Sequence, residues 1–216
     1  MPARALDPAG VALVDKPAGP SSFAIVAQIR RVTGARTGHA GTLDPFATGL
    51  LVVLSGRSTK LAPLLVGLDK RYLTEIDLSA TTTTADPEGE IVERHDAPDE
   101  LDLDGLRGEV ELPVPAASAV KVGGERAYRL HRRGVAVEMP VRRSVVHVLE
   151  VVGRAGPCVT LDLRVSTGTY VRSIAQALGG HCRTLRRLEV GPFSVDEAAP
   201  PETFTLLPEA EALARL

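Results

Sequence analysis

The apolar positions of this 216-residue chain follow a strand-like pattern over several stretches. The uninterrupted apolar run at residues 50–54 is typical of a buried strand. Residues 159–165 alternate between apolar and polar side chains, as half-buried strands do. Residues 73–78 also alternate, with Leu73, Glu75 and Asp77 on one face and Thr74, Ile76 and Leu78 on the other. Two further strands are expected, one at residues 10–16 and one at residues 145–152. The strand at 145–152 is expected to pair with the strand at 159–165. The pattern therefore favours a fold built largely from short strands.

Helical patterns occupy shorter segments between these strands. Ser21 or Ser22 is a suitable N-cap for a helix that runs to about Thr33 and stops at Gly34. Its apolar residues at three-residue spacing are expected to form one buried face: Phe23, Val26, Ile29 and Val32. Further short helices are expected at about residues 58–65, 100–107, 172–178 and 208–216.

The composition is that of a globular protein. Apolar residues make up 44% of the chain, but aromatic residues only 3%, so the core must consist mainly of Leu, Val and Ala. No apolar run reaches membrane-spanning length, and the N-terminus lacks the apolar region of a signal peptide. Cys158 and Cys182 match no metal or redox spacing and are interpreted as buried thiols. We therefore expect a cytoplasmic protein that makes no contact with a membrane.

Charge is segregated along the chain, although the net charge is only −2. Residues 85–111 hold eleven acidic and two basic residues, a balance of −9. Residues 121–143 hold seven basic and two acidic residues, a balance of +5, and residues 172–187 hold four arginines and no acid. Such segregation allows a basic face on a nearly neutral protein, whereas a solvated helix face is the usual explanation of a charge run.

The stretch at residues 38–51 is the first candidate for chemistry. Three glycines there allow sharp turns or close approach to a ligand: Gly38, Gly41 and Gly49. Asp44 is the only acidic residue between positions 16 and 68, and Pro45 biases it toward extended backbone. A single carboxylate on a stiff loop beside a buried strand suits a catalytic group, although most Asp-Pro pairs mark only a turn.

The same stretch, Gly38-His39-Ala40-Gly41-Thr42-Leu43-Asp44-Pro45-x-Ala47-x-Gly49, closely resembles the motif of the bacterial tRNA pseudouridine-55 synthases, the TruB family. Shorter matches are Lys16-Pro17, Lys70-Arg71-Tyr72, the segment 81–89, Gly168-Thr169-Tyr170-Val171-Arg172 and Leu185-Arg186-Arg187. A basic arm at about 115–143 also matches, with Ala117 where the family usually has tyrosine. The resemblance runs from about Gly10 to Phe193, and residues 179–184 lie in a segment shorter than the family's.

This resemblance implies the α+β pseudouridine synthase fold, a mixed, mainly antiparallel sheet with flanking helices. It also implies a catalytic domain at residues 1–193, which includes the basic RNA-contacting arm. Residues 194–216 are expected to be a short C-terminal extension. The family usually carries a further small RNA-binding domain here, and we expect none in this chain.

The resemblance assigns the site residues as well. Asp44 is expected to be the essential carboxylate, either a nucleophile at C1′ of the sugar or a base toward the 2′ proton. Arg172 is expected to keep that carboxylate ionised. Tyr72 is expected to lie against the target uracil as a third catalytic residue. The other substrate-binding residues are expected to be His39, which fills the space left by the flipped base, Tyr170 and Leu185, which line the pocket, and Lys16.

Two of these assignments have plain structural alternatives. Lys16 either orders the active-site loop or faces solvent. A tyrosine at a strand start, as Tyr72 is, is more often a core residue whose hydroxyl reaches the surface.

The implied function is isomerisation of uridine to pseudouridine at position 55, in the T loop of tRNA, after the base is flipped from the stack. The expected partner is the tRNA T-arm, bound by a monomer. No metal or other cofactor is implied, since the five histidines form no ligand pattern. One alternative is an RNA-binding or RNA-folding protein on the same scaffold without turnover, which the set Asp44, Tyr72 and Arg172 disfavours. Another is an unrelated hydrolase using Asp44, which lacks a paired carboxylate or a nucleophile elbow.

Overall fold

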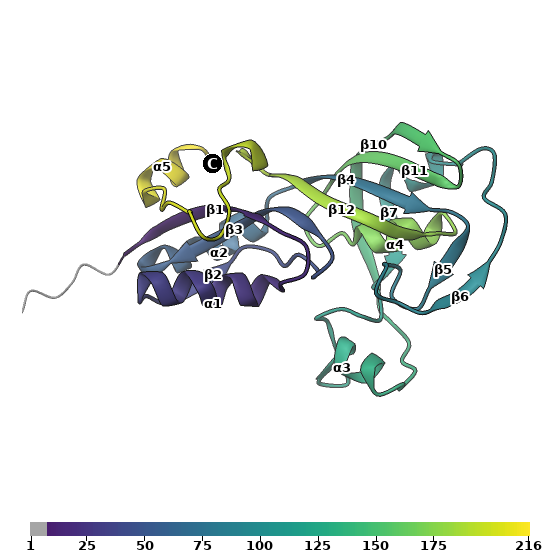
Figure 1. The fold of residues 1–216 in the computed structure, drawn as a ribbon, viewed down its shortest axis with the longest axis horizontal. Coiled ribbons are helices and arrows are strands. Elements are labelled where there is room, and N and C mark those ends of the chain that lie inside the picture. The colour runs from purple at the N-terminus through teal and green to yellow at the C-terminus, as the bar shows by residue number, and fades with distance from the viewer. Residues whose placement is uncertain (1–7) are drawn as a thin grey trace, which may run out of the picture. The chain divides into compact units, whose positions relative to one another are not determined.

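The computed structural model describes residues 8–216 (Figure 1). The chain divides into two compact units, the first formed by residues up to 72 together with 186–216, and the second by residues 73–185. Strands β4 (Lys70–Asp77) and β12 (His181–Val190) each contribute residues to both units. Within the described residues, no helix is long and apolar enough to cross a membrane.

The first unit is built around strand β3 (Thr48–Ser55), whose residues from Gly49 onward are all buried. Strand β1 (Gly10–Lys16) pairs antiparallel with β3 over its whole length, and β12 pairs in parallel with the start of β3. Two short strands extend this arrangement, β2 (Thr37–His39) beside β3 and β13 (Phe193–Ser194) beside β12. The apolar run at 50–54 is therefore a central, fully buried strand, as predicted.

Helix α1 (Ser22–Thr33) has the predicted ends but only part of the predicted buried face. The side chain of Ser21 accepts from the Ala24 amide, and Gly34 ends the helix with a left-handed backbone, φ 66°. Phe23 and Val32 are each 71% exposed. The buried residues are Ser22, Ile25, Val26 and Ile29. The prediction is confirmed for Val26 and Ile29 and wrong for Phe23 and Val32. A three-residue step falls short of one 3.6-residue turn, so each step moves about 60° around the helix and the outer two residues leave the buried face.

Four short helical segments complete the described part of the first unit. The 3-10 helix η1 (Gly56–Leu61) leads into α2 (Ala62–Val66), which corresponds to the helix expected at 58–65. The 3-10 helix η3 (Val195–Glu197) and α5 (Glu209–Ala214) follow β13. The segment after residue 194 returns to β1 through bridges from Val11 to Leu207 and from Val14 to Ala199. The predicted domain boundary at residue 193 stays a prediction.

The second unit contains β10 (Val141–Ala155), the longest strand among the described residues. Strand β10 forms an antiparallel ribbon with β11 (Cys158–Val165), and β7 (Gly108–Pro113) pairs with the start of β10. In hydrogen-bonding order the strands here are β12, β4, β11, β10 and β7. The alternation predicted for residues 159–165 is confirmed, because Val159, Leu161, Leu163 and Val165 are at most 1% exposed. Helix α4 (Val171–Ala177) follows β11, as expected.

Two small hairpins and a short arm complete the second unit. Strands β5 (Ala80–Thr82) and β6 (Ile91–Arg94) pair with one another. Strands β8 (Lys121–Val122) and β9 (Glu125–Arg126) form a tight hairpin that leads into helix α3 (Ala127–Arg132). The helix predicted at 100–107 was wrong: only the 3-10 turn η2 (Asp104–Leu106) forms there. This segment is dense in acids and contains Gly105, and both features disfavour a helix.

The fold class predicted from the sequence is confirmed. The sheet is mixed, since β12 runs parallel to β3, whereas β1 with β3, β10 with β11 and β10 with β7 are antiparallel. Both cysteines are buried and neither forms a disulfide, in agreement with the buried thiols expected from their spacing.

Candidate active site

Asp44 lies in a half-buried turn that connects β2 to β3, and we call residues 41–50 the Asp44 loop. Lys16, at the end of β1, is fully buried beside this loop. Its ammonium donates to the carbonyl oxygens of Pro17 at 2.8 Å, Pro45 at 3.1 Å and Ala47 at 2.7 Å. The alternative of a solvent-facing lysine is therefore wrong, and Lys16 orders the chain immediately after Asp44.

Two further side chains hold the other part of the Asp44 loop, and sequence reasoning missed both. Ser22 of α1 donates its hydroxyl to the carbonyl of Leu43 and accepts from the Leu43 amide, both at 2.8 Å. Arg187 of β12 is only 1% exposed and donates to the carbonyls of Gly41 at 3.0 Å, Thr42 at 3.4 Å and Leu50 at 2.7 Å. A signal for Arg187 was present, because strand alternation places it on the buried side of β12.

Two of the three glycines in the motif have a structural requirement for glycine. Gly49 has φ 98°, and a Cβ there would lie 2.3 Å from the carbonyl oxygen of Arg187. Gly41 has φ 113° and lies beside the Arg187 guanidinium. Gly38 has open space around it and no positive φ, so the freedom expected there is not used in this structure. The glycines thus serve the packing of β3 against β12.

Tyr72 and Lys70 lie on the same face of β4, because residues two apart share a side of a strand. Tyr72 is 8% exposed and Lys70 is 6% exposed. The Lys70 ammonium donates to the carbonyls of Val66 and Leu68 at 2.6 and 2.5 Å. Burial, followed by the positive charge of Arg187, lowers the pKa of Lys70 to about 8.

His39, at the end of β2, carries a buried ring nitrogen that lacks a partner. Its Nδ1 has no hydrogen bond among residues 8–216. Burial, and then the charge of Arg187, lower the pKa of His39 below its ordinary value, so the imidazole is neutral at pH 7. A buried polar atom without a partner costs free energy, which is more often accepted at functional sites than elsewhere.

Arg172, on α4 in the second unit, is held by a buried ion pair with Asp86. Its guanidinium lies 3.1 Å from Asp86 Oδ2 and also donates to the carbonyls of Thr84 at 2.9 Å and Ala117 at 3.0 Å. The other carboxylate oxygen, Oδ1, accepts from Thr84 Oγ1 and from the Glu88 amide. The segment 81–89, noted in the sequence only as a family match, therefore holds the Arg172 guanidinium in place through Thr84 and Asp86.

Two further predicted residues, Tyr170 and Leu185, belong to the second unit. Tyr170 is the half-buried residue that precedes α4, and Leu185 on β12 is 7% exposed. The predicted site residues thus form two sets: Lys16, His39, Asp44 and Tyr72 belong to the first unit, and Tyr170, Arg172 and Leu185 belong to the second.

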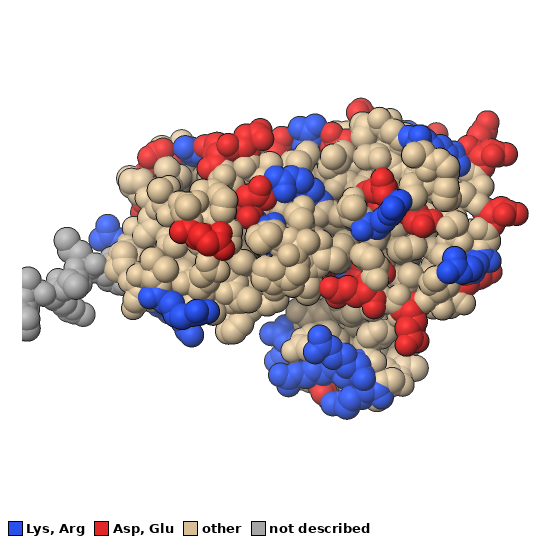
Figure 2. Space-filling model, in the orientation of Figure 1, with Lys and Arg blue, Asp and Glu red and all other residues tan. Residues whose placement is uncertain are grey.

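The arm around α3 carries the densest basic surface visible in Figure 2. Its exposed cations are Lys121, Arg126, Arg129, Arg132 and Arg133. Arg133 pairs with Glu125 through two bonds of 2.6 and 2.8 Å, which closes the arm on itself. The ring of Tyr128 lies under two guanidinium groups, those of Arg129 at 5.9 Å and Arg132 at 5.7 Å.

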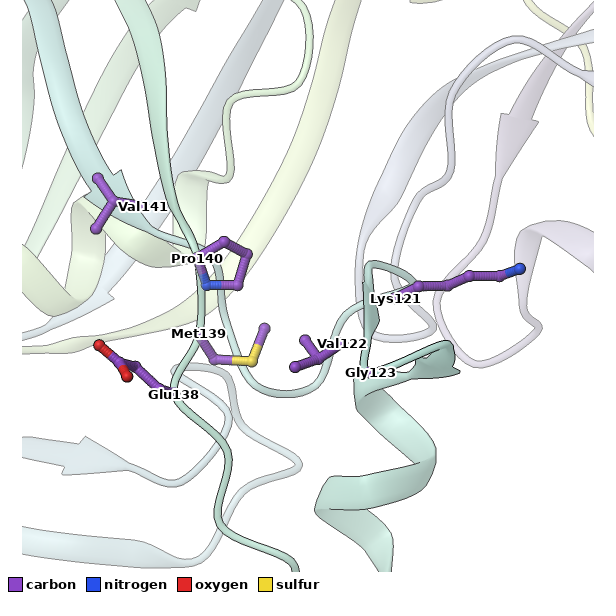
Figure 3. A pocket seen from close by; sticks show the side chains of 7 residues that line it. All are labelled: Lys121, Val122, Gly123, Glu138, Met139, Pro140 and Val141. Atoms are coloured by element: carbon purple, nitrogen blue, oxygen red, sulfur yellow. The ribbon is translucent and has the colours of Figure 1, made fainter.

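A hollow of about 450 Å³ lies at the base of this arm, between residues 121–123 and 138–141 (Figure 3). The side chains of Val122 and Met139 point toward one another there, whereas those of Lys121 and Glu138 point away. No predicted catalytic residue lines this hollow. The candidate chemistry therefore belongs to the two sets of residues described above.

Comparison with known families decides the assignment. Residues 30–171 match the sequence model of the TruB family pseudouridylate synthase (N terminal domain). This chain belongs to the TruB family. The chain is 45% identical over 231 residues to "tRNA pseudouridine synthase B" of Thermobifida fusca, covering 95% of this chain and 78% of the relative. It is 46% identical over 208 residues to the protein of the same name from Mycobacterium sp. (strain KMS), covering 88% and 70%.

Solved structures support the same family at the level of fold. A chain in a Cbf5-Nop10-Gar1 complex is 28% identical with TM-score 0.65, and the match covers 87% of this TruB chain and 50% of that one. A chain in an H/ACA RNP bound to a substrate RNA containing 2′-deoxyuridine is 25% identical with TM-score 0.65, covering 89% and 51%. A pseudouridylate synthase at 17% identity and TM-score 0.56 shows the fold alone.

Removing the charge of Asp86 should destabilise the second unit strongly. Asp86→Asn keeps the shape of the side chain but takes a buried carboxylate away from the Arg172 guanidinium. We expect a loss of about 3 kcal/mol in the free energy of unfolding, measured by urea titration. Glu111→Gln, which breaks the exposed pair with Arg143, is the control and should cost no more than about 1 kcal/mol. Equal losses in the two variants would contradict the structural role given to Asp86.

The buried Lys70 should make stability rise with pH. Its pKa is about 8 in the folded chain and ordinarily 10.5, so between these values the unfolded chain binds more protons. The free energy of unfolding should therefore rise by roughly 2 kcal/mol from pH 8 to pH 10, relative to Lys70→Met. Lys60→Met removes an exposed lysine and should leave the rise in place. Parallel pH curves for the unchanged chain and Lys70→Met would refute the expectation.

Proposed function

We propose that this chain isomerises uridine to pseudouridine in tRNA, at position 55 of the T loop. The observation that carries the proposal is the Asp44 loop: half-buried Asp44 lies on a loop whose main chain is held by side chains from β1, α1 and β12, in a chain that belongs to the TruB family. Relatives covered over most of their length bear the name tRNA pseudouridine synthase B. Position 55 and the T loop come from the family resemblance.

The reaction breaks the bond from uracil N1 to the sugar C1′ and forms a bond from C5 to C1′. The proton on C5 is then lost, and N1 gains a proton, so the product is an isomer of the substrate. Asp44 acts on the sugar either as the nucleophile at C1′ or as the base toward the 2′ proton. By the family resemblance, Arg172 acts as the electrostatic partner of this carboxylate. Neither role requires a cofactor.

The nucleotide must leave its stack before this chemistry can occur. Tyr72 provides a flat aromatic face for the extruded uracil, and the family resemblance assigns Tyr170 and Leu185 to binding of the substrate as well. Neutral His39 occupies the space that the base leaves in the T loop, where its unpaired Nδ1 finds a hydrogen-bond partner. Lys16 contributes through the Asp44 loop and not by contact with RNA.

The basic arm supplies affinity for the T-arm backbone. Its guanidinium groups face solvent and have the charge needed to contact phosphates. We propose that the enzyme works as a monomer in the cytoplasm, where tRNA is found. An RNA-binding protein on the same scaffold without turnover is the competing function, and the Asp44 variant below separates the two.

Asp44→Asn should abolish turnover and preserve binding. The substitution keeps the size of the side chain and removes the charge that either mechanism needs. Pseudouridine formation in a tRNA transcript should fall below detection, while the Kd for tRNA stays equal or tightens, since a negative charge near phosphates is lost. Asp196→Asn, at an exposed position of the same unit, is the control and should leave the rate unchanged. A comparable rate in the Asn variant would exclude Asp44 as the essential carboxylate.

Neutralising the arm should weaken binding and flatten its salt dependence. The triple variant Arg126→Gln, Arg129→Gln and Arg132→Gln removes three exposed charges. The slope of log Kd against log salt should fall by about 2 to 3, because each phosphate contact contributes slightly less than one. The matched control changes Arg30, Arg31 and Arg36, three exposed arginines of the first unit, to Gln. An equal fall in both triples would show that total charge, and not the arm, binds the RNA.

A further inference from the structure

Arg187 is buried without a carboxylate, which is an unusual place for an arginine. It is 1% exposed and forms no ion pair with an acidic side chain among residues 8–216. The nearby titratable groups that feel its charge, Lys70 and His39, both have their pKa lowered by it. Burying a guanidinium beside other basic groups lowers the free energy of unfolding. We therefore expect Arg187 to have a role that offsets this loss of stability.

The hydrogen bonds of Arg187 show what that role is. Nη2 and Nη1 donate to the carbonyls of Gly41 and Thr42, three and two residues before Asp44. Nε donates to the carbonyl of Leu50, six residues after it. One planar group therefore ties together the two ends of the Asp44 loop. Its rigid fork fixes the spacing between those ends, which a flexible ammonium could not do.

Ser22 holds the same loop at the residue adjacent to Asp44. Its hydroxyl forms two 2.8 Å bonds with the main chain of Leu43, one as donor and one as acceptor. Both residues belong to the first unit, as Asp44 does. Neither side chain reaches solvent, since Ser22 is 2% exposed, so their contacts are to the loop and not to RNA.

We propose that Arg187, supported by Ser22, is a positioning residue that fixes the backbone of the Asp44 loop and so aims the Asp44 carboxylate at the sugar. This inference rests on the proposed function and extends it to residues that do not touch the substrate. Displacing a catalytic group by about 1 Å can cost roughly a hundredfold in rate. Loss of the fork should therefore slow chemistry while leaving RNA affinity intact.

The test compares Arg187→Lys and Ser22→Ala with the unchanged chain. Arg187→Lys keeps the charge but can contact one end of the loop only, and Ser22→Ala makes a small change that the fold should tolerate. In single-turnover reactions at saturating enzyme, we expect the rate constant to fall about 100-fold and about 10-fold, respectively. The Kd for tRNA should stay within about threefold of the unchanged value.

Arg215→Gln is the control for a purely structural effect. Arg215 pairs with Glu197 and Glu211 in the same unit and has no contact with the Asp44 loop. This variant should lower Tm without changing the single-turnover rate at temperatures where it is folded. Rates within threefold of the unchanged chain in folded Arg187→Lys and Ser22→Ala would overturn the proposal. It would also be overturned if the lost rate returned at higher enzyme concentration, because the defect would then lie in RNA binding. If Arg187→Lys does not fold, Ser22→Ala decides by the same criteria.

Amide hydrogen exchange supplies a readout that does not depend on activity. The Ala47 amide donates to the carbonyl of Asp44 within the loop, and it should exchange faster in Arg187→Lys while the amides of β3 beyond Leu50 stay protected. Unchanged exchange at Ala47 in both variants would overturn the proposal. An unchanged chain that formed no pseudouridine would contradict the proposed function, and the exchange measurement would still decide the role of Arg187.

Discussion

The Asp44 loop must satisfy buried main-chain carbonyls with donors from outside the loop, and the first unit depends on how this is done. A buried carbonyl without a donor costs free energy comparable to a lost hydrogen bond. Lys16 and Arg187 supply charged donors to five carbonyls between residues 41 and 50, and Ser22 supplies a neutral one between them. Charge-assisted bonds are the stronger kind, so a segment without regular structure is held rigidly. A carboxylate carried on such a segment is preorganised before any substrate binds.

The free-energy cost of burying these charges is seen at two neighbouring basic side chains, Lys70 and His39. Lys70 and His39 are both pushed toward their neutral forms by burial and by Arg187. Glycine at position 49 lets β3 approach the main chain of β12, which brings Arg187 to the loop. Strongly perturbed groups of this sort gather at functional sites, because a site shaped for a ligand leaves some of its own groups poorly satisfied.

In the second unit, the corresponding constraint is the burial of the charged side chain of Arg172. Asp86 neutralises Arg172, and the carbonyls of Thr84 and Ala117 take up further donors of the guanidinium. Such a pair contributes little net stability but is costly to break, so it specifies the conformation of segment 81–89. The exposed arm has the opposite character: its cations stay hydrated and reach outward, where phosphates can replace water around them.

The sequence by itself determined five of the strands and both ends of α1, and it named the candidate residues of the site. Period-two alternation found β4 and β11, and the cap residues Ser21 and Gly34 fixed both ends of the helix, because these signals are local. The long motif around Asp44 indicated the family. Only the tertiary structure decided which face of α1 is buried, that Lys16 is buried, and that Arg187, Ser22 and Asp86 support the site. These facts depend on contacts between residues more than twenty positions apart, up to 146 for Arg187 and Gly41, and no local pattern encodes such a contact.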